Sequence, residues 1–380
     1  MVERAKINPA MMKWARKRAG YINGFEEDLP VDIKSRYESW EKGDTYPTWI
    51  QLRAVSKKYG IPTAFFFMDC SPNFDDIPEM INYRKLDIDS IYETNSPKLL
   101  NSIRKSENRR KIYLELSHEL NEEIIKFEVP NLEKDKKIFA NYIREILDVS
   151  LDTQKSWYKE PKHYNFLSNW KEILNKKMGI LIFETEGVLI EEMRGLCIFH
   201  EEIPIILLNG KDSVNGRIFS LFHELTHLLL GESAICGDDD NLNEEIFCNA
   251  VAGEFLVPEN DLSNNINNEI DLLSGSSLRR LYNMYGVSEY VIIRRLLDTN
   301  KITQEQYNNR FNSFDEFSSS STSSRGNYLS NMIKYNGKAY YSLILDAYDT
   351  GIINSLEFSK FTNLGKNQIP KLQEVFYGGV

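Results

Sequence analysis

The stretch Phe219 to Leu230, FSLFHELTHLLL, indicates both a local structure and a chemistry. It contains His223, Glu224 and His227 in the pattern H-E-x-x-H. Positions four apart lie on one face of a helix, so the imidazoles of His223 and His227 can reach a single ion. Zinc suits two neutral imidazoles with a carboxylate and keeps one position open for water or substrate. The pattern predicts a Zn2+-dependent hydrolase with His223 and His227 as metal ligands and Glu224 as the catalytic base.

An ordinary amphipathic helix that holds two histidines by chance is the alternative. The chain has only five histidines, and the residues around the motif are almost wholly apolar. Charged groups in such a helix are buried and need a partner, and a metal ion is the simplest one. A second His-Glu pair, His118 and Glu119, has Glu122 where the second ligand would stand. The metal site is therefore the favoured interpretation.

A third ligand has to follow downstream, because two histidines do not make a stable zinc site in a protein. Residues 243–258 predict another helix, which a proline helps to end. Glu245 and Asn249 lie one turn apart on one face of that helix, so Glu245 can ligate the metal while the Asn249 amide hydrogen-bonds a ligating histidine. Glu244, Glu254 and Cys248 are the rival ligands. Glu244 points about 100° away from Glu245, Glu254 lies opposite an apolar stretch, and a thiolate is unusual in a hydrolytic site.

Composition limits the classes of protein that this chain can be. Its 380 residues suggest two or three domains, and 42% hydrophobic with 27% charged residues is typical of a globular protein. The net charge of −10 argues against a protein that coats nucleic acid along its whole surface. Residues 1–70 nevertheless hold 12 Lys and Arg against 9 Asp and Glu, a local net charge of +3. No run is long enough to span a bilayer, no secretory h-region is visible, and the four cysteines form no C-x-x-C pair. We expect a cytoplasmic protein without a membrane partner.

The predicted fold class is α+β, with a zincin-like metallopeptidase core at residues 170–300. Four short β-rich runs, 179–183, 187–190, 195–199 and 204–208, predict a small sheet before the motif helix. The last run is our candidate for an exposed edge that pairs with an extended peptide, although it can equally be interior.

The core is flanked by other predicted parts. Helices over 9–19, 31–40 and 47–59 predict a helix-turn-helix-like module at residues 1–70. Residues 71–169 form a helical connector, with one or two long helices over 97–129. A serine-rich linker at residues 301–325 leads to a C-terminal helical module at residues 326–380.

The motif helix and the segment after it resemble the ImmA/IrrE-type metallopeptidases. The resemblance is carried by RIFSLFHELTH at residues 217–227 and by Glu245, Cys248, Asn249 and the run EFLVP at 254–258. It is specific over about residues 195–297. Thr226 stands where family members commonly have glycine, and Val251 where they have phenylalanine. A helix-turn-helix pattern over residues 277–298 resembles the segment that completes the peptidase fold in this family.

The N-terminal residues resemble the repressor-like modules that are fused to some zinc peptidases. WARKRAG, YESWEKGDTYPTWIQL and YGIPTAFFF carry this resemblance. It implies DNA as a partner, with Arg16, Lys17 and Arg18 as the DNA-binding residues. The alternative is a helical docking module, because the segment before the expected recognition helix is acidic rather than basic, with Glu26, Glu27, Asp28 and Asp32.

The family resemblance implies an intracellular zinc endopeptidase that cuts a helix-turn-helix transcriptional repressor and so relieves repression of mobile-element or stress-response genes. The spacing of the motif predicts only a zinc hydrolase. A DNA- or protein-binding transcriptional regulator with a structural or vestigial zinc site is the alternative function, and a protease released only by a signal is a third. Tyr282, Tyr285 and His200 are candidate donors to the oxyanion.

Overall fold

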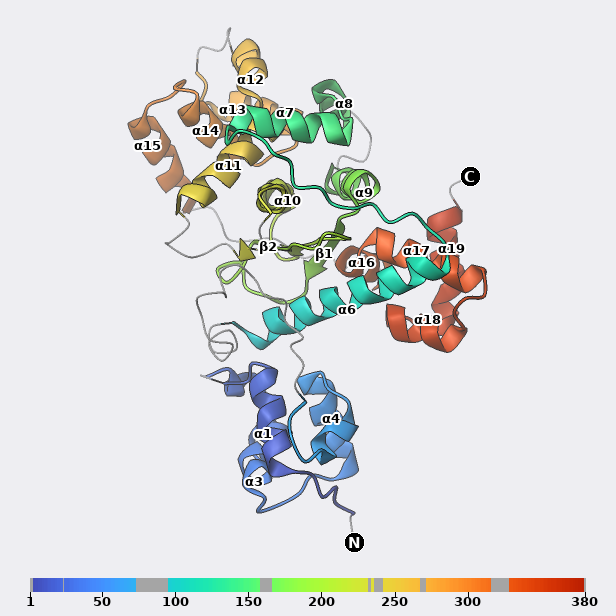
Figure 1. Cartoon of the computed structure of the whole chain (residues 1–380). Coiled ribbons are helices and arrows are strands. Elements are labelled where there is room, and N and C mark those ends of the chain that lie inside the picture. The colour runs from blue at the N-terminus through green and yellow to red at the C-terminus, as the bar shows by residue number, and fades with distance from the viewer. Residues whose placement is uncertain are drawn as a thin grey trace. The chain divides into compact units, whose positions relative to one another are not determined.

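A computed structural model describes residues 3–22, 24–72, 95–157, 166–231, 234–235, 242–266, 271–315 and 328–378 (Figure 1). Two compact units divide the chain. Unit 1 comprises Met1–Asn108 with Glu186–Val188, and unit 2 comprises Arg109–Thr185 with Leu189–Val380. The structure is mostly helical with one small sheet, which confirms the predicted α+β class. Of the predicted serine-rich linker at 301–325, Gln304–Asp315 form a helix, and residues 316–325 lie outside the described residues, as does most of the connector before residue 95.

Unit 1 is built from short helices around an aromatic core. Two of its turns follow directly from the sequence: Thr48 and Gln51 form a capping box at the start of the fourth helix, and Gly60 ends that helix at φ +69°. Trp40, Tyr59 and Phe66 lie in the core. The elements are α1 (Pro9–Arg18), η1 (Phe25–Asp28), α2 (Val31–Lys34), α3 (Tyr37–Lys42), α4 (Trp49–Tyr59) and η2 (Thr63–Phe67), so the helix expected at 31–40 is two helices.

The three basic residues of α1 that we expected to contact DNA do not share one environment. Arg16 is only 8% exposed, and its guanidinium donates to Glu41 Oε1 at 2.6 Å and to the Tyr21 carbonyl at 2.6 Å. Arg18 lies over the Trp14 ring and is half-buried, and of the three only Lys17 is exposed. Arg16 therefore holds unit 1 together, and its placement does not support a phosphate contact.

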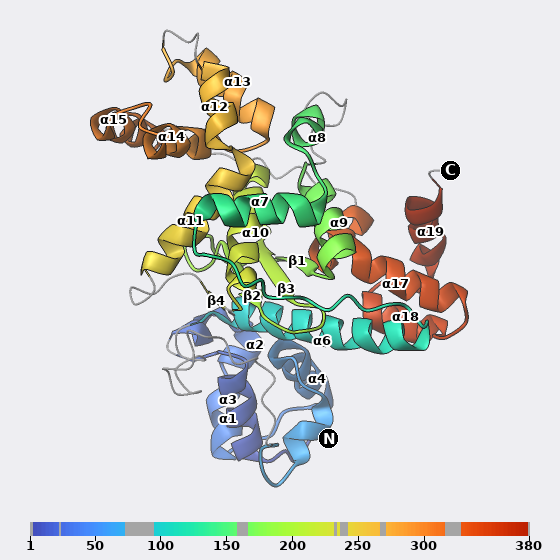
Figure 2. The ribbon, with the colours of Figure 1, turned by 45° about the horizontal axis from the view of Figure 1, so that its top comes forward.

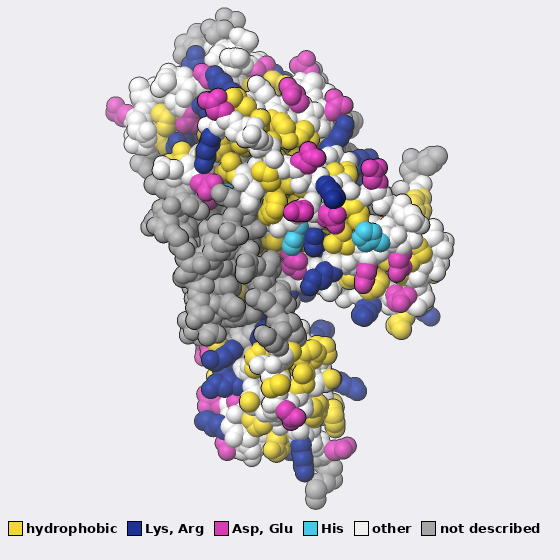
Figure 3. All heavy atoms as spheres, in the orientation of Figure 1, with side chains coloured by type: hydrophobic (Ala, Val, Ile, Leu, Met, Phe, Trp, Pro, Cys, Tyr) yellow, Lys and Arg dark blue, Asp and Glu magenta, His cyan; other side chains and the backbone are white. Residues whose placement is uncertain are grey.

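The surface of unit 1 is apolar as well as basic. On the face shown in Figure 3, hydrophobic side chains gather beside Lys and Arg. Val31 and Ile50 are each 82% exposed. Such a surface is compatible with the docking role as much as with DNA, and DNA binding through Lys17 and Arg18 stays a prediction.

Unit 2 begins within a long helix and continues through three shorter ones. α6 (Pro97–Glu119) contributes residues to both units, and it ends before the predicted residue 129 because Asn121 turns the chain at φ +55°. α7 (Lys136–Leu147), α8 (Leu151–Ser156) and α9 (Phe166–Met178) follow. Asp135 caps α7 by accepting from the Lys137 and Ile138 amides.

The sheet has the strand order β1-β3-β2-β4 among the described residues. β1 (Leu181–Thr185) is parallel to β3 (Ile205–Asn209), and β2 (Gly195–Ile198) is antiparallel to β3 and to the two-residue β4 (Ala234–Ile235). The edge role considered for 204–208 is wrong, because β3 pairs on both sides and every residue in it is buried. The strand predicted at 187–190 is also wrong, since Gly187 turns the chain at φ +81° and Leu189 is 57% exposed.

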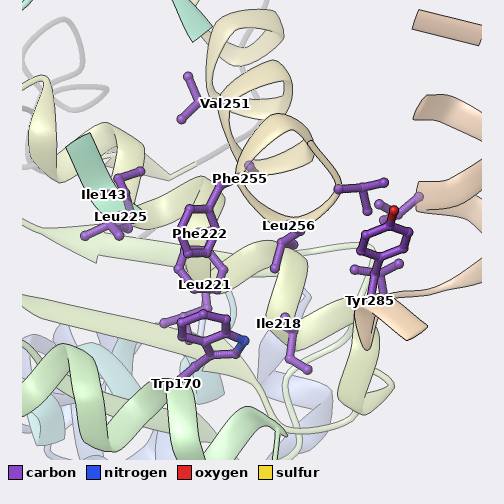
Figure 4. Close-up of a cluster of buried hydrophobic side chains, with 14 of the residues drawn as sticks. Ile143, Trp170, Ile218, Leu221, Phe222, Leu225, Val251, Phe255, Leu256 and Tyr285 are labelled. Carbon is purple, nitrogen blue, oxygen red and sulfur yellow. The ribbon is translucent and has the colours of Figure 1, made fainter. Parts of the chain in front are cut away.

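The core of unit 2 lies around two crossing helices, α10 (Val214–Leu229) and α11 (Leu242–Leu256). Figure 4 shows Phe222 of α10 facing Phe255 of α11, with Trp170 of α9 beside them. The two phenyl rings are 4.2 Å apart, and Trp170 meets Phe222 edge to face at 4.9 Å. α12 (Glu259–Ile266), α13 (Gly275–Tyr285), α14 (Glu289–Asp298) and α15 (Gln304–Asp315) follow.

The C-terminal helices belong to the same compact unit as the sheet. α16 (Tyr328–Asn336) packs against β1 (Figure 1), and α17 (Lys338–Asp349) packs against α9 (Figure 2). α18 (Ser355–Thr362), η7 (Lys366–Gln368) and α19 (Ile369–Tyr377) complete the chain. Within the described ranges, every helix is too short or too polar to cross a bilayer.

The buried ion pair of unit 1 gives a stability prediction. Arg16→Ala leaves Glu41 without its bidentate partner, and breaking a buried pair typically costs about 3 kcal/mol. We therefore expect faster amide hydrogen exchange throughout α1 and α4 in the full chain. Lys17→Ala is the matched control, because Lys17 is exposed and its loss should change stability by less than about 0.5 kcal/mol. Equal rates of amide hydrogen exchange in the two variants would contradict the structural role of Arg16.

Candidate metal centre

α10 is buried along almost its whole length, which forces its polar groups into the interior. Ser213 caps the helix by accepting from the Gly216 amide at 2.9 Å, and β2, β3, α9 and α11 pack around it. His223, Glu224 and His227 are 7%, 1% and 1% exposed. Thr226 is also buried, and its hydroxyl donates to the Phe222 carbonyl at 2.8 Å, so its hydrogen bond is made within the helix.

The structure brings the two histidines together with one carboxylate from α11. His223 Nε2 lies 3.2 Å from Glu245 Oε2, His227 Nε2 lies 3.3 Å from Glu245 Oε1, and the two Nε2 atoms are 3.2 Å apart. One donor atom from each residue lies within 4.8 Å of the others. The i, i+4 spacing on α10 and the packing of α11 against α10 produce this convergence.

Asn249 fixes which nitrogen of His223 faces the centre. Its Oδ1 lies 3.0 Å from His223 Nδ1, so a neutral imidazole donates its Nδ1 proton to Asn249. The Nε2 lone pair then points toward the Glu245 carboxylate and His227. Acceptor atoms that converge in this way repel one another unless a cation lies between them.

The charge of Glu245 reflects the same arrangement. Burial alone would raise the pKa of its carboxyl group. When both imidazoles carry a proton on Nε2, their hydrogen bonds and positive charge outweigh burial and hold the pKa of Glu245 well below its ordinary value. A metal ion would supply the positive charge instead once each Nε2 is a lone pair. Glu245 is thus an anion at neutral pH, and two imidazoles with one carboxylate form a ligand set that suits a divalent transition metal.

The rival third ligands are engaged elsewhere. Glu254 pairs with Arg295 at 2.5 Å inside the core. Glu244 Oε1 lies 3.9 Å from Lys134 Nζ. Cys248 is fully buried, and burial raises the pKa of its thiol despite a contact with His227, which disfavours the thiolate. The geometry favours Glu245.

Glu224 lies beside the first residue of β2, which the sequence motif did not indicate. A methyl group built on Gly195 would lie 2.6 Å from Glu224 Oε1 and 3.0 Å from its Cγ. Only glycine leaves room for this carboxylate at its present position. Gly195 is therefore a positioning residue for Glu224. The only feature of the sequence that could have indicated this role is a glycine at the start of a buried strand.

The three candidate oxyanion donors differ in their surroundings. The Tyr285 hydroxyl donates its proton to Asp261 Oδ2 at 2.5 Å, so this proton is already used in a hydrogen bond that does not involve the metal ligands. Tyr282 packs against the core cluster, and His200 is half-buried two residues after the end of β2. Tyr282 and His200 are therefore the two candidate oxyanion donors.

The geometry predicts how metal affinity depends on each side chain. His223→Ala and His227→Ala should abolish binding, and Glu245→Ala should weaken it by more than the roughly 10- to 100-fold that loss of an outer-shell partner costs. Metal content of the purified variants and calorimetric titration with Zn2+ measure this. Glu244→Ala is the matched control and should bind like the parent. Full metal content in Glu245→Ala, with loss in Glu244→Ala, would overturn the ligand assignment.

One family model matches the part of the chain that carries this centre. Residues 175–297 match the family model of the IrrE N-terminal-like domain, Peptidase_M78. The matched range contains the four described strands and the helices α10 and α11. These two helices carry His223, His227 and Glu245, which we call the His–Glu group. A search of curated proteins finds no match to the chain. The family match supports a metallopeptidase of the IrrE/ImmA type in this part of the chain.

Proposed function

We propose that the protein is a zinc-dependent endopeptidase whose metal is held by His223, His227 and Glu245. The observation that carries the proposal is the convergence of these three side chains within 4.8 Å, inside a region that matches a peptidase family. The same ligand types also suit iron. The adjacent Glu224 favours hydrolysis, because a purely structural site has no use for a second carboxylate beside it.

Peptide hydrolysis needs an activated water, a polarised carbonyl and a proton carrier. A zinc ion held by His223, His227 and Glu245 would supply the first two, by lowering the pKa of a water and acting as a Lewis acid. Glu224 accepts the proton of the attacking water and returns it to the leaving amine. Asn249 holds the His223 ring in one tautomer, and Gly195 keeps the Glu224 carboxylate in place.

The substrate we propose is a helix-turn-helix transcriptional repressor. The support is the resemblance to ImmA/IrrE-type peptidases and the match to the IrrE N-terminal-like domain. Cleavage would relieve repression of mobile-element or stress-response genes in the cytoplasm. Unit 1, with its exposed apolar residues, is the part of the chain that we propose for docking to this partner or to DNA.

The alternative is a DNA- or protein-binding regulator whose zinc is structural. It predicts that the protein displaces the repressor from DNA without cutting it. The position of Glu224, 1% exposed and next to the metal ligands, favours the enzyme.

Glu224→Gln tests the enzyme directly. The amide keeps the size of the side chain but cannot take a proton, so the variant should fold, hold zinc and bind its partner. General-base catalysis is typically worth about 10²- to 10⁴-fold, and cleavage should fall by at least that range. Helix-turn-helix repressors from the same genome and a quenched peptide library serve as substrates, with fragment masses as the readout. Cleavage at the parental rate, or repressor displacement without fragments in the parent, would contradict the proposal.

Gly195→Ala tests how the base is positioned. The added methyl group overlaps Glu224 Oε1 and must displace it, so we expect reduced cleavage with unchanged zinc content. Gly275→Ala is the matched control, because a methyl group there meets no atom within 4 Å. Parental activity in Gly195→Ala would show that Glu224 works from another position.

A further inference from the structure

A cavity of about 790 Å³ lies in unit 2, lined by residues other than the His–Glu group. Residues of α6, α9, β1, α16, α17 and α19 line it, together with the first turn of α10. Cavities of about 300–1,000 Å³ are the size that proteins use for small organic ligands. The lining combines apolar side chains, among them Leu167, Ile182 and Phe376, with several charged groups.

One wall of this cavity carries more positive than negative charge. Glu184 of β1 is 5% exposed, and three cations surround its carboxylate: Lys171 at 2.5 Å, Arg217, and Lys334 at 3.4 Å. One negative charge against three positive charges leaves a local excess of +2. We call Lys171, Glu184, Arg217 and Lys334 the Glu184 cluster.

The cations of the Glu184 cluster are not fully satisfied by its single carboxylate. Burial lowers the pKa of the Lys171 ammonium, although Glu184 opposes this. The Arg217 side chain is 8% exposed, and its buried Nε donates no hydrogen bond to any described residue. Like charges held together in a buried place repel, and an anion from outside offsets this repulsion with charge-assisted hydrogen bonds.

Other lining residues define the remainder of the ligand. Glu122 and Asp346 also line the cavity, and burial together with Asp346 raises the pKa of Glu122. Carboxyl groups accept hydrogen bonds from hydroxyl or amino groups. The lining therefore suits a molecule with one anionic group, an apolar body and hydrogen-bond donors.

We propose that this cavity binds a small organic anion, a phosphate or a carboxylate, whose charged group lies beside Lys171, Arg217 and Lys334. Val214 and Arg217 belong to α10, and Arg217 precedes the ligand His223 by six residues on that helix. Such a ligand contacts the helix that carries the metal site. Its binding does not depend on the proposed peptidase activity and is measured separately from it.

Thermal unfolding of the full chain with matched probes tests this proposal. The probes are adenosine 5′-monophosphate, adenosine 5′-carboxylic acid, adenosine and inorganic phosphate, each at millimolar concentration. We expect at least one organic anion to raise Tm by about 2 °C or more, and adenosine to leave it unchanged. The monophosphate and the carboxylic acid distinguish the two anionic groups, and inorganic phosphate shows whether the anion alone suffices.

Two variants locate the binding. Lys334→Gln removes a cation that is 34% exposed, so the protein should fold, and the affinity for the anion should fall at least about tenfold. Lys360→Gln removes one exposed charge on α18, which does not line the cavity, and should bind like the parent. No Tm shift with any anion, or equal affinity in Lys334→Gln and the parent, would overturn the proposal.

Discussion

The site depends on the burial of acceptor groups that face one another inside an apolar core. The Nε2 atoms of His223 and His227 and the carboxylate oxygens of Glu245 lie 3.2–3.3 Å from one another, and both imidazoles are less than 9% exposed. Water cannot solvate such a group well, so the repulsion has to be offset by a cation. Every other feature of the centre follows from this requirement. Asn249 orients the lone pair, α11 delivers the carboxylate, and Gly195 leaves space for a second carboxylate that does not join the ligand group.

The packing around α10 makes that arrangement rigid. Trp170, Phe222 and Phe255 interlock between α9, α10 and α11, so the two helices that carry the ligands keep a fixed separation. Rigid elements hold catalytic groups more accurately than loops do. The first turn of the same helix reaches the Glu184 cluster, which places a charged cavity and the metal ligands on one element.

The sequence allowed the local features to be predicted, since they depend on spacing along one helix. His223 with His227, and Glu245 with Asn249, are one turn apart and needed no tertiary information. Features that depend on long-range pairing could not be predicted. β3 is interior because it lies between β1 and β2 in the sheet. Arg16 is held in the interior by Glu41 of α3, which is 25 residues away in the sequence. Gly195 contacts Glu224, which is 29 positions further along the chain. The Glu184 cluster draws on four separate elements, so no window of sequence contains it.

The central claim is that two imidazoles and one carboxylate form the metal site, with a neutral Cys248 outside it. X-ray absorption at the zinc edge of the metal-loaded full chain measures this directly. We predict a first shell of nitrogen and oxygen at about 2.0–2.2 Å, with multiple-scattering features from two imidazoles. A sulfur contribution at about 2.3 Å, or a shell that lacks imidazole scattering, would contradict it.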